Sequence, residues 1–517
     1  MTSRLHKSLK NARVAFFFYF MALVLAFISR KVFIDTLGTE LVGLSATMRN
    51  ILGFLNLAEL GVYTAVATSL YSPLVKDEKV KINEIISLFG FFYRIIGLFI
   101  LAAGVILSIF LPQIFSRTEL SLLILYAAYF TFLATTLVSY FNNYKQVLLV
   151  ADQRQYMLTR ITNWLNILKI TLQILYVKYI APDYLVWLGI ELSFGLIIRF
   201  MLNRKAVKEY PWLTTNLGEG RALFVKYKDI ILKVKQLFVH KIAEFALYQT
   251  GNILVFALTS LSMVTYYTNY TIIFTKITTL VSSTLGSNLA GVGHVIAEKD
   301  AGKIKKVFWE FNAMFYWIAG SLVFSLYYLT EPFITLWLGA EFILEKAVFI
   351  IMLFNVYVRI TRQTINFFIN GYGIFRDVWA PWTEAAINIG IAIGVGYFYG
   401  LLGVVLGMAI SSMLIVVLWK PFFLYREGFK EKFWPFWKYT GIYIFLLIAC
   451  WALFYPWIHS GWLPEPDTYL KWLFLALCLS IPFTILYAVM LYFSAPGMKD
   501  FYHRLRPIFI SKLENFR

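Results

Sequence analysis

Five basic side chains lie inside long apolar stretches of this 517-residue sequence: Arg30, Arg49, Lys276, Arg359 and Arg362. An ionised side chain at bilayer depth costs at least about 2.5–3.5 kcal/mol, so it usually faces a protein interior or a water-filled cavity. Arginine also binds phosphate through two parallel hydrogen bonds. The five residues therefore predict a cationic cavity that attracts an anion.

Polar residues extend this pattern along helical faces, because residues three, four, seven and eleven apart share one face of a helix. Those grouped with the cations are Asn56, Asn269, Asn355, Asn366 and Asn370. Arg359 and Arg362 lie in one stripe with three of these asparagines, and one helix cannot bring all five to the head-group region. We expect a water-lined face there, although each polar residue taken singly is also typical of an interhelical hydrogen bond.

Three acidic residues accompany the cations: Glu59, Glu244 and Glu384. They are interpreted either as partners in structural ion pairs or as sites that couple transport to H⁺ or Na⁺. Arg49 and Glu59 are about 15 Å apart along one helix, so each needs another partner. No metal site or other cofactor is predicted. The sequence has no GxxxxGK[ST] motif, so ATP hydrolysis is not expected.

Composition indicates a membrane protein, since 60% of the residues are hydrophobic, 15% are charged and the mean hydropathy is +0.70. Runs of about 20 apolar residues match the length of a membrane-crossing helix and favour helices over barrel strands. We predict an all-α polytopic protein with about fourteen spans. The expected ranges are 14–34, 43–71, 87–111, 120–142, 157–180, 184–203, 241–261, 265–294, 307–330, 343–370, 379–399, 401–423, 438–458 and 469–493.

The net charge of +19 follows the predicted topology. Loops on one side hold most of the basic residues outside the spans, whereas the loops on the other side hold Arg117 alone. By the positive-inside rule both termini are cytoplasmic. The basic runs 226–241 and 303–306 are expected beside lipid head groups, so no nucleic acid partner is predicted. Lys346 and Lys420, near span ends, are expected to reach the interface, and Lys169 to do so or to face inward.

The sequence also contains an internal repeat. A shift of 222 residues places the first six spans on the next six, Arg154 on Arg376 and Arg204 on Arg426. Because each copy has an even number of spans, the copies are parallel repeats. We predict an N-terminal six-helix lobe (1–204), a connecting loop (205–240), a C-terminal six-helix lobe (241–426), and two further helices with a tail (427–517).

The first eighty residues resemble the start of Wzx-type oligosaccharide flippases of the multidrug/oligosaccharidyl-lipid/polysaccharide (MOP) superfamily. The resemblance is carried by residues 28–34 (ISRKVFI), 37–38 (LG), 43–44 (GL), 57–61 (LAELG) and 70–74 (LYSPL). Beyond them it rests on the span count and the repeat. It implies the MOP-type fold and a non-enzymatic activity. Such proteins move undecaprenyl-diphosphate-linked sugar repeat units across the bacterial cytoplasmic membrane for O-antigen and related polysaccharides.

The expected mechanism is alternating access, with the lipid-linked head group crossing in the cationic lumen. Polysaccharide polymerases and glycosyltransferases are the expected protein partners. Two alternatives remain open. One is a multidrug or organic-cation antiporter of the same fold, which calls for an acidic lumen. The other is an integral-membrane glycosyltransferase or polymerase that uses Asp35 or Glu40, for which a turn or helix-capping role is the simpler interpretation.

Overall fold

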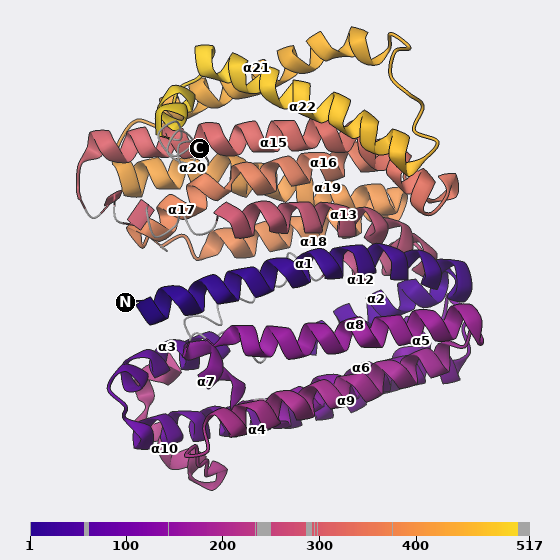
Figure 1. Ribbon diagram of the computed structural model, residues 1–517, viewed down its shortest axis with the longest axis vertical. Coiled ribbons are helices and arrows are strands. Elements are labelled where there is room, and N and C mark those ends of the chain that lie inside the picture. The colour runs from indigo at the N-terminus through magenta and orange to yellow at the C-terminus, as the bar shows by residue number, and fades with distance from the viewer. Residues whose placement is uncertain are drawn as a thin grey trace, which may run out of the picture. The chain divides into compact units, whose positions relative to one another are not determined.

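The structure is a computed structural model that describes residues 2–55, 62–142, 144–152, 154–232, 234, 250–285, 292–293, 295–296, 298–374 and 376–504. Within these ranges every regular element is a helix, as Figure 1 shows. The chain forms two compact units, Met1–Thr265 and Tyr266–Arg517. The all-α fold class is therefore confirmed, whereas the predicted division into two lobes, a loop and a tail stays a prediction.

The first unit is built from long antiparallel helices, among which α4, α6 and α9 lie side by side (Figure 1). Its elements are α1 (Thr2–Leu37), α2 (Thr39–Leu55), α3 (Val62–Val75), α4 (Lys79–Ile109), α5 (Leu111–Ile114), α6 (Leu122–Asn142), α7 (Gln146–Ala151), α8 (Gln155–Tyr179), α9 (Tyr184–Glu209), η2 (Leu217–Glu219), α10 (Gly220–Lys226) and α12 (Gly251–Leu258). Helix α13 (Leu261–Leu285) begins in this unit and continues in the second.

The second unit contains a helical hairpin in which α18 and α19 pack tightly, and a long central helix, α15. Its further elements are α15 (Ala301–Trp337), η3 (Ala340–Phe342), α16 (Lys346–Thr361), α17 (Gln363–Tyr372), α18 (Trp379–Tyr399), α19 (Leu401–Ser412), η4 (Met413–Trp419), α20 (Lys420–Phe423), η5 (Leu424–Phe429), α21 (Trp434–Ile458) and α22 (Tyr469–Ser494).

Nine helices in the described part of the chain are long and apolar enough to cross a membrane. They are Phe17–Leu37, Lys79–Ile109, Leu122–Phe141, Tyr184–Glu209, Ala301–Trp337, Lys346–Tyr372, Leu401–Phe429, Trp434–Ile458 and Tyr469–Ser494. Helices α8 and α18 cover two more of the predicted spans. The chain is therefore a multi-pass membrane protein, and the total of about fourteen spans stays a prediction.

The helix starts repeat with the period expected from the sequence. Helices α2 and α13 begin at Thr39 and Leu261, and α4 and α15 begin at Lys79 and Ala301, so each pair differs by 222 residues. The start of α13 packs on the start of α2, where the Thr265 hydroxyl donates to the Thr39 carbonyl over 2.7 Å. A Cβ at Gly43 would overlap the Leu261 carbonyl. Under the same shift Thr39 corresponds to Leu261 and Gly43 to Thr265, so the two contacts are equivalent.

Helix ends are fixed by local chemistry. Gly38 has a φ of +84°, a left-handed conformation that glycine adopts without strain, and it allows α2 to begin directly after α1. Asp183 accepts hydrogen bonds from the first turn of α9, Asp300 caps α15 and Thr468 caps α22. These side chains satisfy backbone N–H groups that have no partner within the helix. The caps therefore set where α9, α15 and α22 begin.

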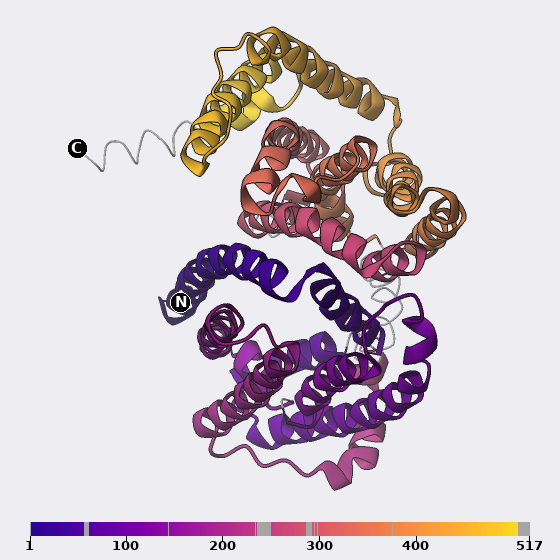
Figure 2. The same cartoon turned by 90° about the vertical axis from the view of Figure 1, so that its right-hand side faces the viewer.

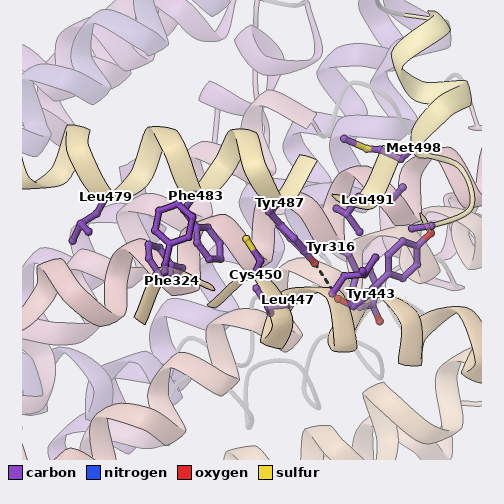
Figure 3. Packing of buried hydrophobic residues seen from close by; sticks show 14 of the residues in the cluster. Tyr316, Phe324, Tyr443, Leu447, Cys450, Leu479, Phe483, Tyr487, Leu491 and Met498 are labelled. Carbon is purple, nitrogen blue, oxygen red and sulfur yellow. Dashed lines mark hydrogen bonds between the residues drawn. The ribbon is translucent and has the colours of Figure 1, made fainter. Parts of the chain in front are cut away.

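Helices α21 and α22 lie outside the repeat and pack on each other and on α15 (Figure 2). Their shared core is aromatic, and the rings of Phe324 and Phe483 stack in parallel with centroids 3.6 Å apart. Figure 3 shows this cluster, in which Tyr487 donates to the Tyr443 carbonyl over 3.2 Å. Cys450 is buried in it as a free thiol and contributes to the packing.

The α18–α19 hairpin gives a test of the packing. A Cβ at Gly403 would overlap the backbone of Gly396, whereas a Cβ at Gly394 would meet no atom within 4 Å. Gly403→Ala should therefore destabilise the fold by about 1–3 kcal/mol, because the helices must separate. Thermal unfolding in detergent micelles measures this, with Gly394→Ala as the matched control. Equal melting temperatures for both variants would contradict the close approach.

Candidate functional site

A charged cluster lies within the helices of the first unit. Glu191 of α9 accepts a hydrogen bond from Lys169 of α8 over 3.0 Å and one from Arg49 of α2 over 3.4 Å. The side chains of Lys169 and Glu191 are 13% and 12% exposed, and that of Arg49 is 54% exposed. Two cations thus share one carboxylate. Lys169 faces inward, which settles the alternative that the sequence left open.

Neutral side chains hold this cluster in place. Gln173, which is buried, donates to Glu191 over 3.1 Å and to the Trp187 carbonyl over 3.2 Å. The Arg49 guanidinium lies 4.8 Å from the centre of the Phe132 ring, which adds a cation–π contact from α6. Arg49 therefore contacts side chains of α6 and α9, which places it among the helices of its own unit.

The cluster lies away from the ends of its helices, of which α9 is long and apolar enough to cross a membrane. Arg49 follows the start of α2 by ten residues, and Lys169 precedes the end of α8 by ten. With a rise of 1.5 Å per residue, both lie ~15 Å from those helix ends. Glu191 follows the start of α9 by seven residues, or ~10 Å. At this depth an ionised group needs a partner, and Glu191 provides it.

Arg30 is anchored separately, by a hydrogen bond of 3.1 Å to the carbonyl of Thr265 at the start of α13. Lys31, the next residue, pairs with Asp35 over 3.2 Å one turn later on the same helix. Glu40 lies in the first turn of α2. A carboxylate there is favoured by the partial positive charge of the helix start. Glu40 thus lies where a helix-capping role would place it, whereas Asp35 lies within α1 and forms an ion pair there instead of a turn or cap.

The polar stripe predicted for 343–370 forms one face of α16 and α17. Asn355, Arg359, Arg362 and Asn366 are half-buried and Asn370 is exposed, whereas the remaining faces hold buried residues such as Ile360 and Phe367. Asn355 donates to the Val405 carbonyl of α19 over 3.3 Å, which is the interhelical bond expected of a single polar residue. On α17 the stripe is thus the less buried side, whereas α16 also exposes Ile350 and Phe354 on another face.

Glu384 lies buried on α18, and the cations that interact with it electrostatically are Arg362 and Lys420. Lys420 also forms an ion pair of 2.6 Å with the buried Asp377. Lys420 therefore has an acidic partner within its own unit, and its approach to the lipid interface stays a prediction. Lys346 likewise pairs with Glu331 over 2.9 Å while its side chain stays 47% exposed.

The remaining predicted residues are less informative. Asn269 is buried and Lys276 is half-buried, both on α13. Asn56, Glu59 and Glu244 lie outside the described residues. In the part of the chain that is described, no three His, Cys, Asp or Glu side chains gather as a metal site would require. The structure thus joins Arg49 to Glu191 by an ion pair within the first unit, and in the second unit Arg362 interacts with Glu384 electrostatically.

A second network joins the ends of α8 and α9 that are predicted to face the cytoplasm. Arg154 pairs with Asp152 over 2.7 Å and with Glu209 over 2.9 Å, and the Tyr210 hydroxyl donates to Asp152 over 3.0 Å. Burial raises the pKa of Tyr210, and the nearby Asp152 carboxylate raises it further. In the second unit Arg376, the repeat equivalent of Arg154, approaches Glu427 at 3.8 Å.

Glu191 was not among the residues predicted from sequence. A signal was available, because Glu191 is the single charged residue between Asp183 and Arg199 in an otherwise apolar span. Its role depends on two other helices, and the spacing of residues within one helix does not reveal such contacts. Sequence reasoning found the cations Arg49 and Lys169 without the carboxylate that joins them.

A double-mutant cycle tests the cluster. Glu191→Gln should destabilise the protein by about 3–5 kcal/mol, because it leaves Lys169 buried without a counter-charge. Adding Lys169→Met should restore part of this loss, since the exposed Arg49 can be solvated. Chemical unfolding in detergent measures the coupling energy. The exposed pair Lys471–Asp467, 2.7 Å apart, is the control and should show about 0.2–1 kcal/mol. Additive effects of the Glu191 and Lys169 substitutions would rule out a shared buried ion pair.

Comparisons with known proteins place this geometry in a known fold. No protein-family model and no curated protein sequence matches the chain. A solved structure of the lipid II flippase MurJ in an inward closed conformation is similar over 93% of this chain and 98% of its own, with 15% identity and a TM-score of 0.61. An inward-facing MATE family multidrug resistance transporter of the MOP superfamily is similar over 78% of this chain and 95% of its own, with 13% identity and a TM-score of 0.56. The chain therefore has the fold shared by these transporters.

Proposed function

We propose that this protein is a flippase for lipid-linked oligosaccharides, which moves undecaprenyl-diphosphate-linked sugar repeat units from the inner to the outer leaflet of the bacterial cytoplasmic membrane. The observation that carries the proposal is the excess of cations among the helices. Among the described residues of the first unit, Arg49 and Lys169 share the carboxylate of Glu191, whereas in the second unit Lys420 is paired with Asp377 and Arg362 interacts electrostatically with Glu384. An interior with this balance favours an anionic substrate over a cationic one.

The diphosphate and the sugars of the proposed substrate match the arginines and asparagines, respectively, on the faces of α16 and α17. A diphosphate carries several oxygens that accept paired N–H donors, and the planar guanidinium of arginine matches this geometry. Sugar hydroxyls both donate and accept, as the amide groups of Asn366 and Asn370 do. Both asparagines lie on the less buried face of α17, one to two turns beyond Arg362. The stripe thus offers groups for both parts of the head group.

The fold supports transport by alternating access, in which repeats rock and expose a site to one side of the membrane at a time. The MurJ structure is that of a flippase for lipid II, a lipid-linked substrate. We extend that kind of substrate to this chain, with both termini in the cytoplasm and with polymerases and glycosyltransferases of polysaccharide synthesis as partners. Buried Glu384, together with Glu59 and Glu244, is the proposed site of coupling to H⁺ or Na⁺.

A second candidate is an antiporter for organic cations, which the similarity to a MATE transporter favours. Such a substrate requires carboxylates that have no basic partner. In the described residues Glu191 is paired with Lys169, and Asp377 with Lys420. The charge balance therefore favours the flippase. Resistance to cationic drugs on expression of the protein would reverse this preference.

The transport assay targets the arginine pair of the stripe. Arg359→Ala/Arg362→Ala should lower translocation of an undecaprenyl-diphosphate-linked oligosaccharide in proteoliposomes at least about tenfold, since each hydrogen bond to a charged group contributes about 1.5–3 kcal/mol. The control is Arg376→Ala/Arg426→Ala, which removes the same charge from side chains that are 86% and 67% exposed. Unchanged transport by the folded Arg359/Arg362 variant would remove these two residues from the substrate path.

A further inference from the structure

Part of the connection between the two repeats is bound to a helix of the first unit. Residues Thr214–Tyr227, which we call the strap, follow α9 and pack on the first turns of α4 (Figure 1). The Asn83 amide of α4 donates to the Thr214 hydroxyl over 2.9 Å. The Ser87 hydroxyl, one turn further along α4, accepts from the backbone N–H of Asn216 over 3.0 Å. The strap therefore begins along one face of α4.

Two glycines allow the strap to approach α4 closely. A Cβ at Gly90 would lie 2.5 Å from the Leu217 side chain, and a Cβ at Gly220 would lie 2.2 Å from the Phe91 ring. Beyond Gly220 the strap continues as α10, whose Leu223 is buried. From Asn83 to Phe91 the strap thus covers about two turns of α4.

The strap ends back near its starting point, where a carboxylate of α4 holds it. Glu84 accepts hydrogen bonds from the Lys226 ammonium over 2.6 Å and from the Tyr227 hydroxyl over 2.5 Å. The Lys226 side chain is 57% exposed, and Val225 beside it is 62% exposed. An ion pair this exposed contributes little and is screened by salt. The end of the strap can therefore leave α4 without unfolding the helix beneath it.

The second repeat is followed by a much shorter connection. Four residues, 430–433, separate η5 from α21, whereas the connection between α9 and α12 is 210–250, forty-one residues in all. Glu84 is also replaced by a lysine, Lys306, at the position 222 residues later. The strap and its carboxylate therefore belong to the connection between the repeats and not to the repeated unit.

We propose that the strap is a reversible restraint on the separation of those ends of the two repeats that are predicted to face the cytoplasm. While it is docked, the connection between the repeats is short, which favours the state in which these inner ends are close. Release of Lys226 and Tyr227 from Glu84 frees up to fourteen residues, or up to ~50 Å of additional chain at ~3.5 Å per residue. The inner ends can then separate. This inference rests on the alternating access of the proposed function.

The first experiment measures whether Glu84 holds the strap. A nitroxide is attached at Val225→Cys in a cysteine-free background of the full-length protein, and its mobility is measured by electron paramagnetic resonance in nanodiscs. Glu84→Gln should increase the mobility, and the charge exchange Glu84→Lys/Lys226→Glu should largely reverse the increase. The matched control is Glu298→Gln, which removes a carboxylate from an exposed ion pair with Lys303 and should leave the mobility unchanged.

A second variant displaces the strap without altering any charge. Gly220→Ala places a methyl group against the Phe91 ring and should also increase the mobility of the label at Val225→Cys. Gly189→Ala is its control, because a Cβ at Gly189 would meet no atom within 4 Å. Agreement between Gly220→Ala and Glu84→Gln separates loss of docking from a local effect of the lost charge.

The second experiment measures the effect on the repeats. Nitroxides at Arg204→Cys and Arg426→Cys, which are equivalent positions of the two repeats with exposed side chains, report the distance between the inner ends by double electron–electron resonance. The protein with an intact strap should populate mainly the shorter distance. Glu84→Gln and Gly220→Ala should each shift the population towards the longer distance.

Two results would overturn the restraint. One is unchanged mobility at Val225→Cys in both Glu84→Gln and Gly220→Ala, and the other is greater mobility with an unchanged distance between the inner ends. Neither measurement uses a substrate, so failure of the restraint is separable from failure of the proposed function. A released strap and a longer distance in a protein that does not transport lipid-linked oligosaccharides would contradict the proposed function alone.

Discussion

The structure depends on ion pairs that neutralise the charged side chains within its apolar helices. A lysine or arginine about 15 Å from a helix end is too far inside the membrane for its charge to reach the lipid head groups readily. It is therefore stabilised by an ion pair with a carboxylate on another segment of the chain. Glu191 provides this carboxylate for Lys169 and Arg49. Lys420 pairs instead with Asp377, in the loop between α17 and α18. Because these pairs join segments that are distant in sequence, they also help to fix which helices pack together in each unit.

The repeat explains why a similar arginine–carboxylate contact occurs in both units. Helices that start 222 residues apart have the same order in both copies. Arg154 pairs with Glu209, and its equivalent Arg376 approaches Glu427; each of these carboxylates lies at or near the end of the sixth predicted span of its copy. The membrane-depth charges differ, however. The first unit holds two cations on Glu191, whereas the second places a stripe of two arginines and three asparagines on α16 and α17. A shared fold thus carries two different polar surfaces.

Much of the fold could be predicted from the sequence because its signals are local. The apolar runs predict both ends of α22 and the start of α9 to within one residue, whereas α4 begins eight residues before its predicted span, and Gly38 marks the turn between α1 and α2. The face that carries Arg359 and Arg362 follows from helical spacing alone. The partners of Arg49 and Lys420 do not, because Glu191 and Asp377 come from segments far from them in the sequence. A charged residue in one span predicts that an oppositely charged partner exists, but it does not indicate which other segment of the chain carries that partner.

The central claim is that the polar stripe faces water at positive potential. The most direct measurement introduces Asn366→Cys into a Cys450→Ala/Cys478→Ala background and compares how fast anionic and cationic methanethiosulfonate reagents modify it. Arg359 and Arg362 remain in place, so they attract anions and repel cations. The account predicts faster modification by the anionic reagent, with a difference that shrinks in high salt. No modification by either reagent, or faster modification by the cationic one, would contradict it.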